Sequence, residues 1–129
     1  MIYLLIAVGG AVGSVLRYVV GRAAQGASAS GFPIGTMVVN ISGCFLIGIL
    51  LRQFLNMQVS AELRAFLVVG FCGGFTTFST FSGETLGLIE GGEYGRAATY
   101  VILSVTLCLA ATFAGMACVR LIAGASHGR

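Results

Sequence analysis

The sequence has very few charged residues. They occupy 9% of its 129 positions, whereas a typical soluble domain carries about 25%. Lysine is absent, and the seven arginines are scattered along the chain without forming a basic run. A chain with so little charge cannot cover a water-facing surface, and the scattered arginines give little support to nucleic-acid binding.

Residues for metal or disulfide chemistry are also scarce. The four cysteines (Cys44, Cys72, Cys108 and Cys118) lie in apolar surroundings, none in a Cys-x-x-Cys pair, and the single histidine, His127, is in the C-terminal tail. We therefore expect buried free thiols and neither a disulfide framework nor a zinc site. An enzyme is the least supported class, because no nucleophile–base pair or ligand cluster is present.

Apolar sequence dominates instead, since 57% of the residues are hydrophobic. About 20 apolar residues cross the core of a bilayer, and the chain has four such segments, at about 2–21, 34–51, 65–89 and 97–122. The first resembles a signal peptide but lacks a basic start, so we interpret it as a retained helix. The sequence therefore predicts an all-α membrane protein, with residues 1–129 forming one domain of four transmembrane helices.

The third apolar segment carries an unusual polar stretch, from Gly70 to Glu84. A Gly-Gly pair, Gly73-Gly74, is followed by a run of threonine, serine and phenylalanine. Non-helical chain at membrane depth survives only inside protein or along a wet path. We predict that the third helix is broken at Gly73-Gly74, which would offer carbonyls to a cation and helix N-terminal amides to an anion.

Polar side chains also recur at helical spacing in the second and fourth segments. The two stripes contain Thr36, Asn40 and Cys44, and Tyr100, Ser104, Cys108 and Thr112. An asparagine near mid-membrane must be hydrogen-bonded, either to tie helices together or to donate to a passing ion. We favour the second role for Asn40 and expect the stripes to share one polar interior with the broken helix.

Glycine patterns predict close helix packing in two places. Gly9, Gly10 and Gly13 give the first segment a small face, and residues 83, 87, 91 and 95 form a ridge of glycines. Arg17 lies on the first segment beside these glycines. It either extends to the lipid headgroups or places a positive charge at the mouth of an anion path.

The arginines indicate only a weak preference for one orientation in the membrane. One side would carry Arg52, Arg64, Arg120 and Arg129, and the other Arg22 and Arg96, with Arg17 just inside. Because topology follows the arginine and lysine bias of short loops, the chain could insert either way. We therefore predict an antiparallel, dual-topology homodimer.

If two copies meet at their broken helices, both chains would present carbonyls near Gly73 and Thr76. Such neutral oxygens suit a hard monovalent cation such as sodium. Beyond the break, amide groups begin the second half-helix and ring edges carry partial positive charge, so a small hydrated anion is the expected passenger. The residues on that path would be Arg17, Asn40, Phe78, Ser79, Thr80 and Phe81.

Three stretches of the sequence resemble one known family. Residues 10–18, residues 35–43 and above all the run Phe75-Thr76-Thr77-Phe78-Ser79-Thr80-Phe81-Ser82 are similar to those of the Fluc (CrcB) fluoride channels. The resemblance covers nearly the whole chain. It implies passive fluoride export across the cell membrane through a dual-topology homodimer, which lowers cytoplasmic fluoride.

The resemblance also implies roles for individual residues. A structural sodium ion at the dimer interface would bind the main-chain oxygens of Gly73 and Thr76. The fluoride pathway would include Asn40, the phenylalanines Phe78 and Phe81, and the polar residues Ser79, Thr80, Glu84, Tyr100 and Ser104. Cys108 stands where the family pattern leads us to expect serine or a similar small polar residue.

Two other functions remain as alternatives. A small proton-coupled transporter of drugs or metabolites would need a carboxylate in its first helix, but the first segment has none and Glu84 is the only acid at depth. A structural subunit of a larger membrane complex would explain the glycine ridges. It would not explain the threonine, serine and phenylalanine run.

Overall fold

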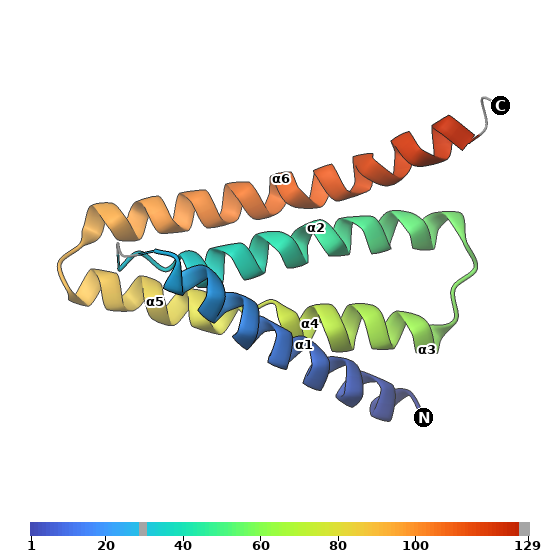
Figure 1. The fold of residues 1–129 in the computed structure, drawn as a ribbon, viewed down its shortest axis with the longest axis horizontal. Coiled ribbons are helices and arrows are strands. Elements are labelled where there is room, and N and C mark those ends of the chain that lie inside the picture. Colours follow the sequence, from blue (N-terminus) through green and yellow to red (C-terminus); the bar gives the residue numbers. More distant parts are fainter. Residues whose placement is uncertain (29–30, 127–129) are drawn as a thin grey trace.

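The computed structural model describes residues 1–28 and 31–126, so His127 and Arg129 lie outside the described residues. Within those ranges every regular element is helical, and four spans are long and apolar enough to cross a membrane. The chain is therefore a multi-pass membrane protein (Figure 1). Its elements are α1 (Ile2–Gly26), α2 (Ile34–Asn56), α3 (Ala61–Arg64), the π-helix η1 (Ala65–Cys72), α4 (Gly73–Phe75), α5 (Phe78–Glu90) and α6 (Tyr94–Ser126).

The spans are longer than the apolar segments that predicted them. The first helix continues to Gly26 and the second to Asn56, while the fourth runs from Tyr94 to Ser126. The third span begins at Ala61, where the side chain of Ser60 caps the helix by accepting from the Leu63 amide. Hydropathy marks the part of a helix that crosses hydrocarbon, whereas main-chain hydrogen bonding continues into the flanking polar residues.

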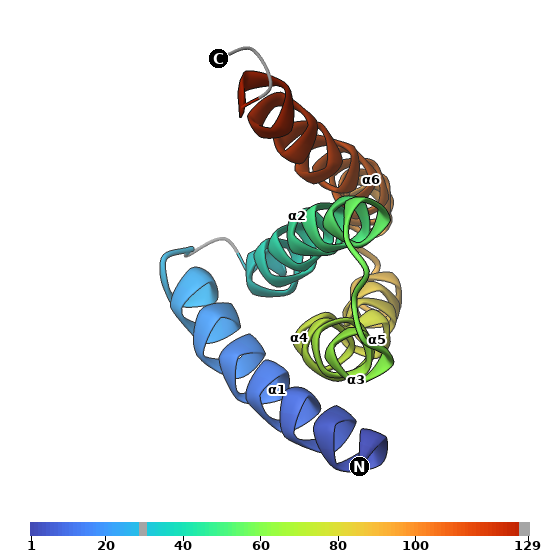
Figure 2. The ribbon, with the colours of Figure 1, turned by 90° about the vertical axis from the view of Figure 1, so that its right-hand side faces the viewer.

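The helices associate mainly as two pairs. One pair is α1 packed against η1 and α4, and the other is α2 packed against α6. The view along the bundle shows α2 between α6 and the elements of the third span (Figure 2). In Figure 1, α2 and α6 run in the same direction. Because they are parallel, residues at matching positions of the two helices face each other along their length.

Glycines allow the two helices of each pair to approach closely. A Cβ atom on Gly9 would lie 2.5 Å from the Phe66 carbonyl oxygen, and one on Gly13 would collide with the Phe71 carbonyl. In the second pair, a Cβ on Gly48 would collide with the Thr112 carbonyl. The close packing predicted for the glycines of the first segment is therefore confirmed for Gly9 and Gly13.

The glycine ridge predicted for the third span, unlike Gly9 and Gly13, is not covered by a neighbouring helix at most of its positions. A Cβ on Gly83, Gly87 or Gly95 would meet no atom of the described chain within 4 Å. This face of α5 is smooth and open, so any partner for it must come from outside one copy of the chain.

The turn between α5 and α6 brings those helices side by side. Gly92 adopts φ 75°, a left-handed conformation that glycine reaches without a steric penalty. The Glu93 amide donates to the Leu88 carbonyl across this turn. Positions one to two turns from it, including Glu84 and Tyr100, consequently meet.

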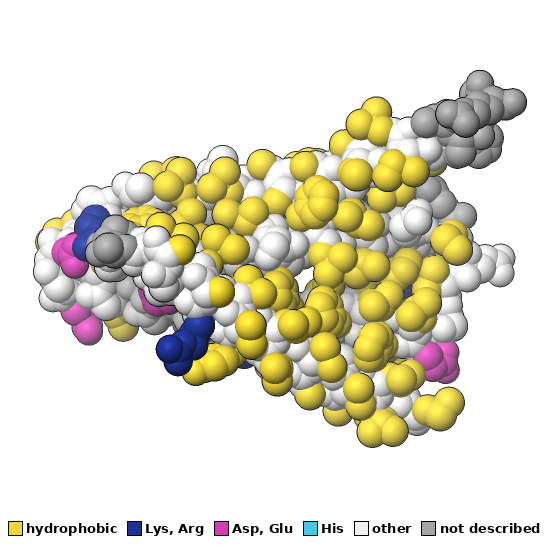
Figure 3. Space-filling model, viewed as in Figure 1, with side chains coloured by type: hydrophobic (Ala, Val, Ile, Leu, Met, Phe, Trp, Pro, Cys, Tyr) yellow, Lys and Arg dark blue, Asp and Glu magenta, His cyan; other side chains and the backbone are white. Residues whose placement is uncertain are grey.

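The outer surface of the bundle is apolar. Hydrophobic side chains cover the middle of the face in Figure 3, and many large ones are exposed, including Tyr3, Val15, Phe113 and Leu121. Such a surface would be unfavourable in water. It is the surface expected of a protein whose solvent is the interior of a bilayer.

The Gly48 contact predicts a difference between two glycine substitutions. Gly48→Ala forces a methyl group into the Thr112 backbone, which we expect to cost about 1–3 kcal/mol of stability through overpacking. Gly26→Ala is the matched control, because a Cβ there meets nothing within 4 Å. Thermal unfolding in detergent micelles should show a lower melting temperature for Gly48→Ala only. Equal melting temperatures would contradict the close α2–α6 contact.

Candidate functional site

The third span departs from helical geometry at two threonines. Thr76 has φ −83° and ψ 159°, and Thr77 has φ −149° and ψ 113°, so both have extended backbone between α4 and α5. The predicted position of the break, Gly73-Gly74, is wrong, because both glycines are helical in α4. Gly74 instead serves close packing, since a Cβ there would lie 2.5 Å from the Gly10 carbonyl oxygen.

Asn40 on α2 pairs with both main-chain groups of Thr77 at this interruption. The Thr77 amide donates to Asn40 Oδ1 at 2.8 Å, and Asn40 Nδ2 donates to the Thr77 carbonyl at 3.1 Å. In a continuous helix the Thr77 amide would instead donate to the carbonyl of Gly73, four residues earlier. The asparagine side chain therefore diverts the donor that Gly73 would otherwise have.

On the other side of the interruption, the side chain of Thr77 caps the start of α5. Thr77 Oγ1 accepts from the Thr80 amide at 3.2 Å, donates to Thr80 Oγ1 at 3.0 Å and lies 3.2 Å from Ser79 Oγ. Threonine is a favoured N-cap residue for this reason. The Thr80 amide would otherwise donate to the Thr76 carbonyl. Both carbonyls singled out from the sequence, those of Gly73 and Thr76, thus lose their helical donors.

The two polar stripes face each other across the parallel helices α2 and α6. Thr36 and Tyr100 both donate to Glu84, and Cys44 and Cys108 line the same groove from the two helices. We name this series of facing pairs the polar ladder. Its pairs, in order along the helices, are Thr36 with Tyr100, Asn40 with Ser104, Cys44 with Cys108, and Gly48 with Thr112.

A groove of about 520 Å³, the central groove, lies between the polar ladder and the third span. The Ser104 hydroxyl is buried beside it and has no hydrogen-bond partner. Because buried hydroxyls are almost always paired, Ser104 is a candidate donor to a ligand in the groove. The groove is lined by Asn40, Gly43, Cys44, Ile47, Val68, Cys72, Gly73, Thr76, Thr77, Phe78, Phe81, Ser104, Val105, Cys108 and Leu109.

The two phenylalanines after the interruption are in contact. The ring centroids of Phe78 and Phe81 are 5.5 Å apart, and Phe81 lies 5.1 Å from the ring of Tyr100. Phe78 is 77% exposed in the single chain, whereas Phe81 is partly buried. Both rings border the central groove.

Glu84 lies on the other side of Thr77 from the central groove. Its carboxylate accepts from Thr36 Oγ1 at 2.8 Å and from the Tyr100 hydroxyl at 2.6 Å. It lines a second hollow of about 310 Å³ together with Arg17, Thr77 and Thr80. We name this the Arg17 hollow. Seven of the nine predicted pathway residues thus line one of two spaces, and Thr77 lines both.

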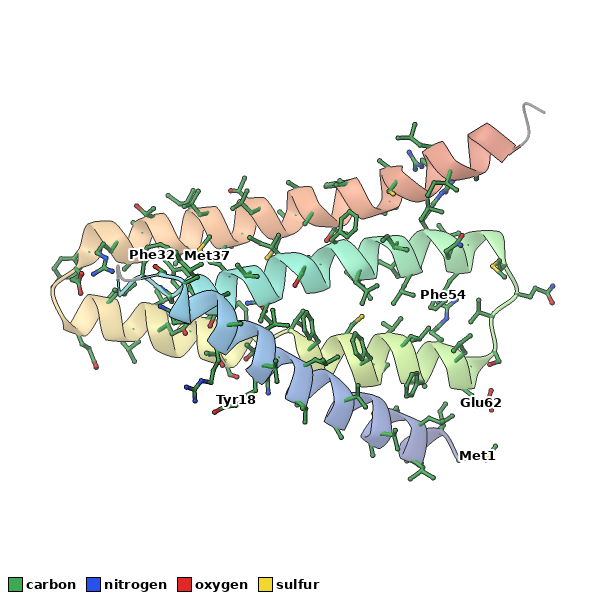
Figure 4. The ribbon with its side chains drawn as sticks, viewed as in Figure 1. Met1, Tyr18, Phe32, Met37, Phe54 and Glu62 are labelled. Atoms are coloured by element: carbon green, nitrogen blue, oxygen red, sulfur yellow. The ribbon has the colours of Figure 1, made fainter. Side chains whose placement is uncertain are left out.

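Two predicted residues do not line either space. Ser79 is exposed at the start of α5 and reaches only Thr77. Tyr100 is 0% exposed and belongs to an apolar cluster with Leu88 and Ala97, against which Phe32 and Met37 pack. Figure 4 labels these last two side chains at the end of the bundle where α5 turns into α6. Tyr100 therefore contacts the site from behind, through its hydroxyl on Glu84 and its ring beside Phe81.

The site offers neutral oxygen ligands to a cation. In residues 1–28 and 31–126, no group of three or more histidine, cysteine, aspartate or glutamate side chains gathers in a way that could hold a metal ion. The carbonyls of Gly73 and Thr76, which have lost their helical donors, belong to residues that line the central groove.

Two residues important to this geometry were not selected from the sequence as site residues. Thr77 caps α5 and binds Asn40, and Thr36 fixes Glu84. The signal for Thr77 was available, because threonine at the first position before a helix is a favoured cap. The signal for Thr36 was its place one turn before Asn40 in the same stripe.

Comparison with known proteins identifies the family. The family model described as "CrcB-like protein, Camphor Resistance (CrcB)" matches residues 4–116. Several relatives carry the name "Fluoride-specific ion channel FluC". A Thermus thermophilus protein of that name is 52% identical over 113 residues, covering 88% of this chain and 90% of the relative.

Two further relatives carry the same name and are similarly close in sequence. A Rhizobium etli protein is 50% identical over 121 residues, covering 91% of this chain and 94% of the relative. A Geobacter sulfurreducens protein is 48% identical over 118 residues, covering 91% and 95%. The resemblance drawn from the threonine, serine and phenylalanine run is confirmed, and the chain belongs to the CrcB family of membrane proteins.

Proposed function

We propose that this chain forms a fluoride-selective channel in the cell membrane that lets fluoride leave passively and so lowers cytoplasmic fluoride. Relatives at about half identity are named for that activity. The observation that carries the proposal is the pair of hydrogen bonds between Asn40 and Thr77, which interrupts the third span beside a groove lined by unpaired polar groups.

The central groove supplies what a small anion needs when it loses its water. The Ser104 hydroxyl is unpaired, and Asn40 keeps one amide N–H after donating the other to Thr77. The edges of Phe78 and Phe81 add partial positive charge. No carboxylate lines this groove, so an anion meets donors there and no negative charge. Small donors at close range favour a small, strongly hydrated anion such as fluoride.

The Arg17 hollow suits an entrance to the same pathway. Arg17 gives it positive charge, and Thr80 offers a hydroxyl. Both Glu84 oxygens accept hydrogen bonds from Thr36 and Tyr100, which holds the carboxylate in a fixed position. Fluoride would pass Thr77, which lines both spaces, with Ser79 beside it at the start of α5.

A structural sodium ion between two antiparallel copies completes the proposal. The carbonyls of Gly73 and Thr76 lack their helical donors and belong to residues that line the central groove. Two oxygens are too few to enclose a hard cation, so a second copy would add its own Gly73 and Thr76 carbonyls to the same site. The open glycine face at Gly83 and Gly87 and the weak arginine bias both support such a partner.

The proposal is tested by reconstituting the purified chain into potassium fluoride-loaded liposomes. On addition of a potassium ionophore, a fluoride-selective electrode should record release within seconds to minutes, whereas chloride-loaded vesicles should retain their chloride. Equal release of both anions would contradict selectivity. Release that requires a proton gradient would favour the proton-coupled transporter instead.

Replacing the phenylalanine rings should reduce fluoride release. Phe78→Ile and Phe81→Ile keep apolar volume but remove the ring edges, and we expect at least a roughly tenfold loss, equivalent to about 1.4 kcal/mol in barrier height. Phe113→Ile is the matched control, because Phe113 is 70% exposed on α6 and does not line the groove. Wild-type release from both groove variants would remove the rings from the pathway.

Two substitutions of Asn40 should separate its role as a donor to the anion from its role in pairing with the Thr77 main chain. Asn40→Asp keeps the acceptor for the Thr77 amide but adds negative charge and loses the donor, so fluoride release should nearly cease. Asn40→Ala leaves both main-chain groups of Thr77 unpaired, which should cost about 1–3 kcal/mol of stability as well. Release is read with the fluoride electrode and stability by thermal unfolding. Normal release by Asn40→Asp would place Asn40 outside the pathway.

A further inference from the structure

Two thiols face each other inside the bundle, in the third pair of the polar ladder. Cys44 on α2 and Cys108 on α6 both line the central groove. One helical turn further along, Gly48 packs directly against the Thr112 backbone, which holds α2 and α6 close together near the two thiols. The two sulfur atoms are therefore positioned by rigid helices and are not carried on a loop.

We propose that Cys44 and Cys108 form a binding site for one soft, two-coordinate metal cation, of the class of Cu(I) or Hg(II), inside the central groove. Thiolate is the ligand that such cations prefer. Two facing sulfur atoms supply the two ligands that such a closed-shell ion takes. Zinc is a poor fit, because structural zinc takes four ligands and no larger group of ligating side chains gathers in the described ranges.

Binding at this pair requires no change of oxidation state. Each thiol loses its proton, two metal–sulfur bonds form, and the two protons pass to solvent, so the complex gains the metal ion and loses two hydrogens. Both cysteines are free before binding. The reaction thus needs nothing beyond the cation itself.

The position of this site gives it a consequence for transport. Cys44 and Cys108 lie one helical turn beyond Asn40 and Ser104, in the groove that Phe81 also lines. A cation held there would fill the space next to the donors assigned to the anion. Metal binding itself is independent of the proposed function, whereas block of fluoride release rests on it.

The binding is tested with Hg²⁺ added in equimolar amount to the purified full chain in detergent, followed by intact-mass measurement. Wild type should gain one mercury and lose two hydrogens, which identifies a bridge between two sulfur atoms. Cys118→Ala is the matched control and should keep the bridge, because Cys118 does not line the groove. Cys44→Ala and Cys108→Ala should lose it and bind Hg²⁺ roughly 10²-fold more weakly, since the second contact no longer adds to the first.

A third variant, Cys72→Ala, identifies the partner, because Cys72 lines the same groove from η1. It should keep the bridge. A bridge that survives in either Cys44→Ala or Cys108→Ala, or that disappears in Cys72→Ala, would overturn the assignment, as would mercury bound without loss of two hydrogens in wild type.

Fluoride release provides the second measurement. In wild-type vesicles Hg²⁺ should reduce release at least roughly tenfold, a dithiol should restore it, and Cys44→Ala should be resistant. Undiminished release from protein that carries the mercury bridge would overturn the block. If wild type releases no fluoride at all, the proposed function fails, while the mass measurement still decides whether the metal site exists.

Discussion

One asparagine side chain determines the course of the third span. Asn40 accepts from the Thr77 amide and donates to the Thr77 carbonyl, so a residue that should continue a helix is instead paired with α2. An unpaired peptide group at this depth would cost several kcal/mol. The interruption persists because the Thr77 amide and carbonyl are both paired with Asn40 and the Thr80 amide is paired with the Thr77 side chain.

The surrounding helices pack closely about this interaction. Helix α1 approaches η1 and α4 through bare glycine surfaces, and α2 packs closely on α6. The parallel α2 and α6 bring the polar residues of both into register, including the unpaired Ser104 hydroxyl. Close glycine packing therefore surrounds both the interruption and its polar lining.

The sequence predicted the features that depend on local composition. The four apolar spans and the packing of Gly9 and Gly13 follow from hydropathy or helical spacing. The position of the interruption did not follow, because Gly73 and Gly74 tolerate irregular backbone but do not require it. It is fixed by Asn40, a residue distant in sequence, and by the cap at Thr77. Likewise, the four predicted spans implied that the second and fourth helices run parallel, but the two polar stripes did not show which of their residues would face each other.

The central claim is that the diverted amide of Thr77 leaves the Gly73 carbonyl free to bind a cation. Labelling glycine with ¹³C at the carbonyl and ¹⁵N at the amide gives nitrogen–carbonyl correlations in solid-state NMR only at Gly-Gly pairs, which begin at Gly9, Gly73 and Gly91. Replacing sodium by a bulky organic cation in bilayer samples should move the Gly73 carbonyl signal and leave the other two unchanged. A Gly73 signal at the frequency of an ordinary helical carbonyl, with no response to sodium, would contradict the account.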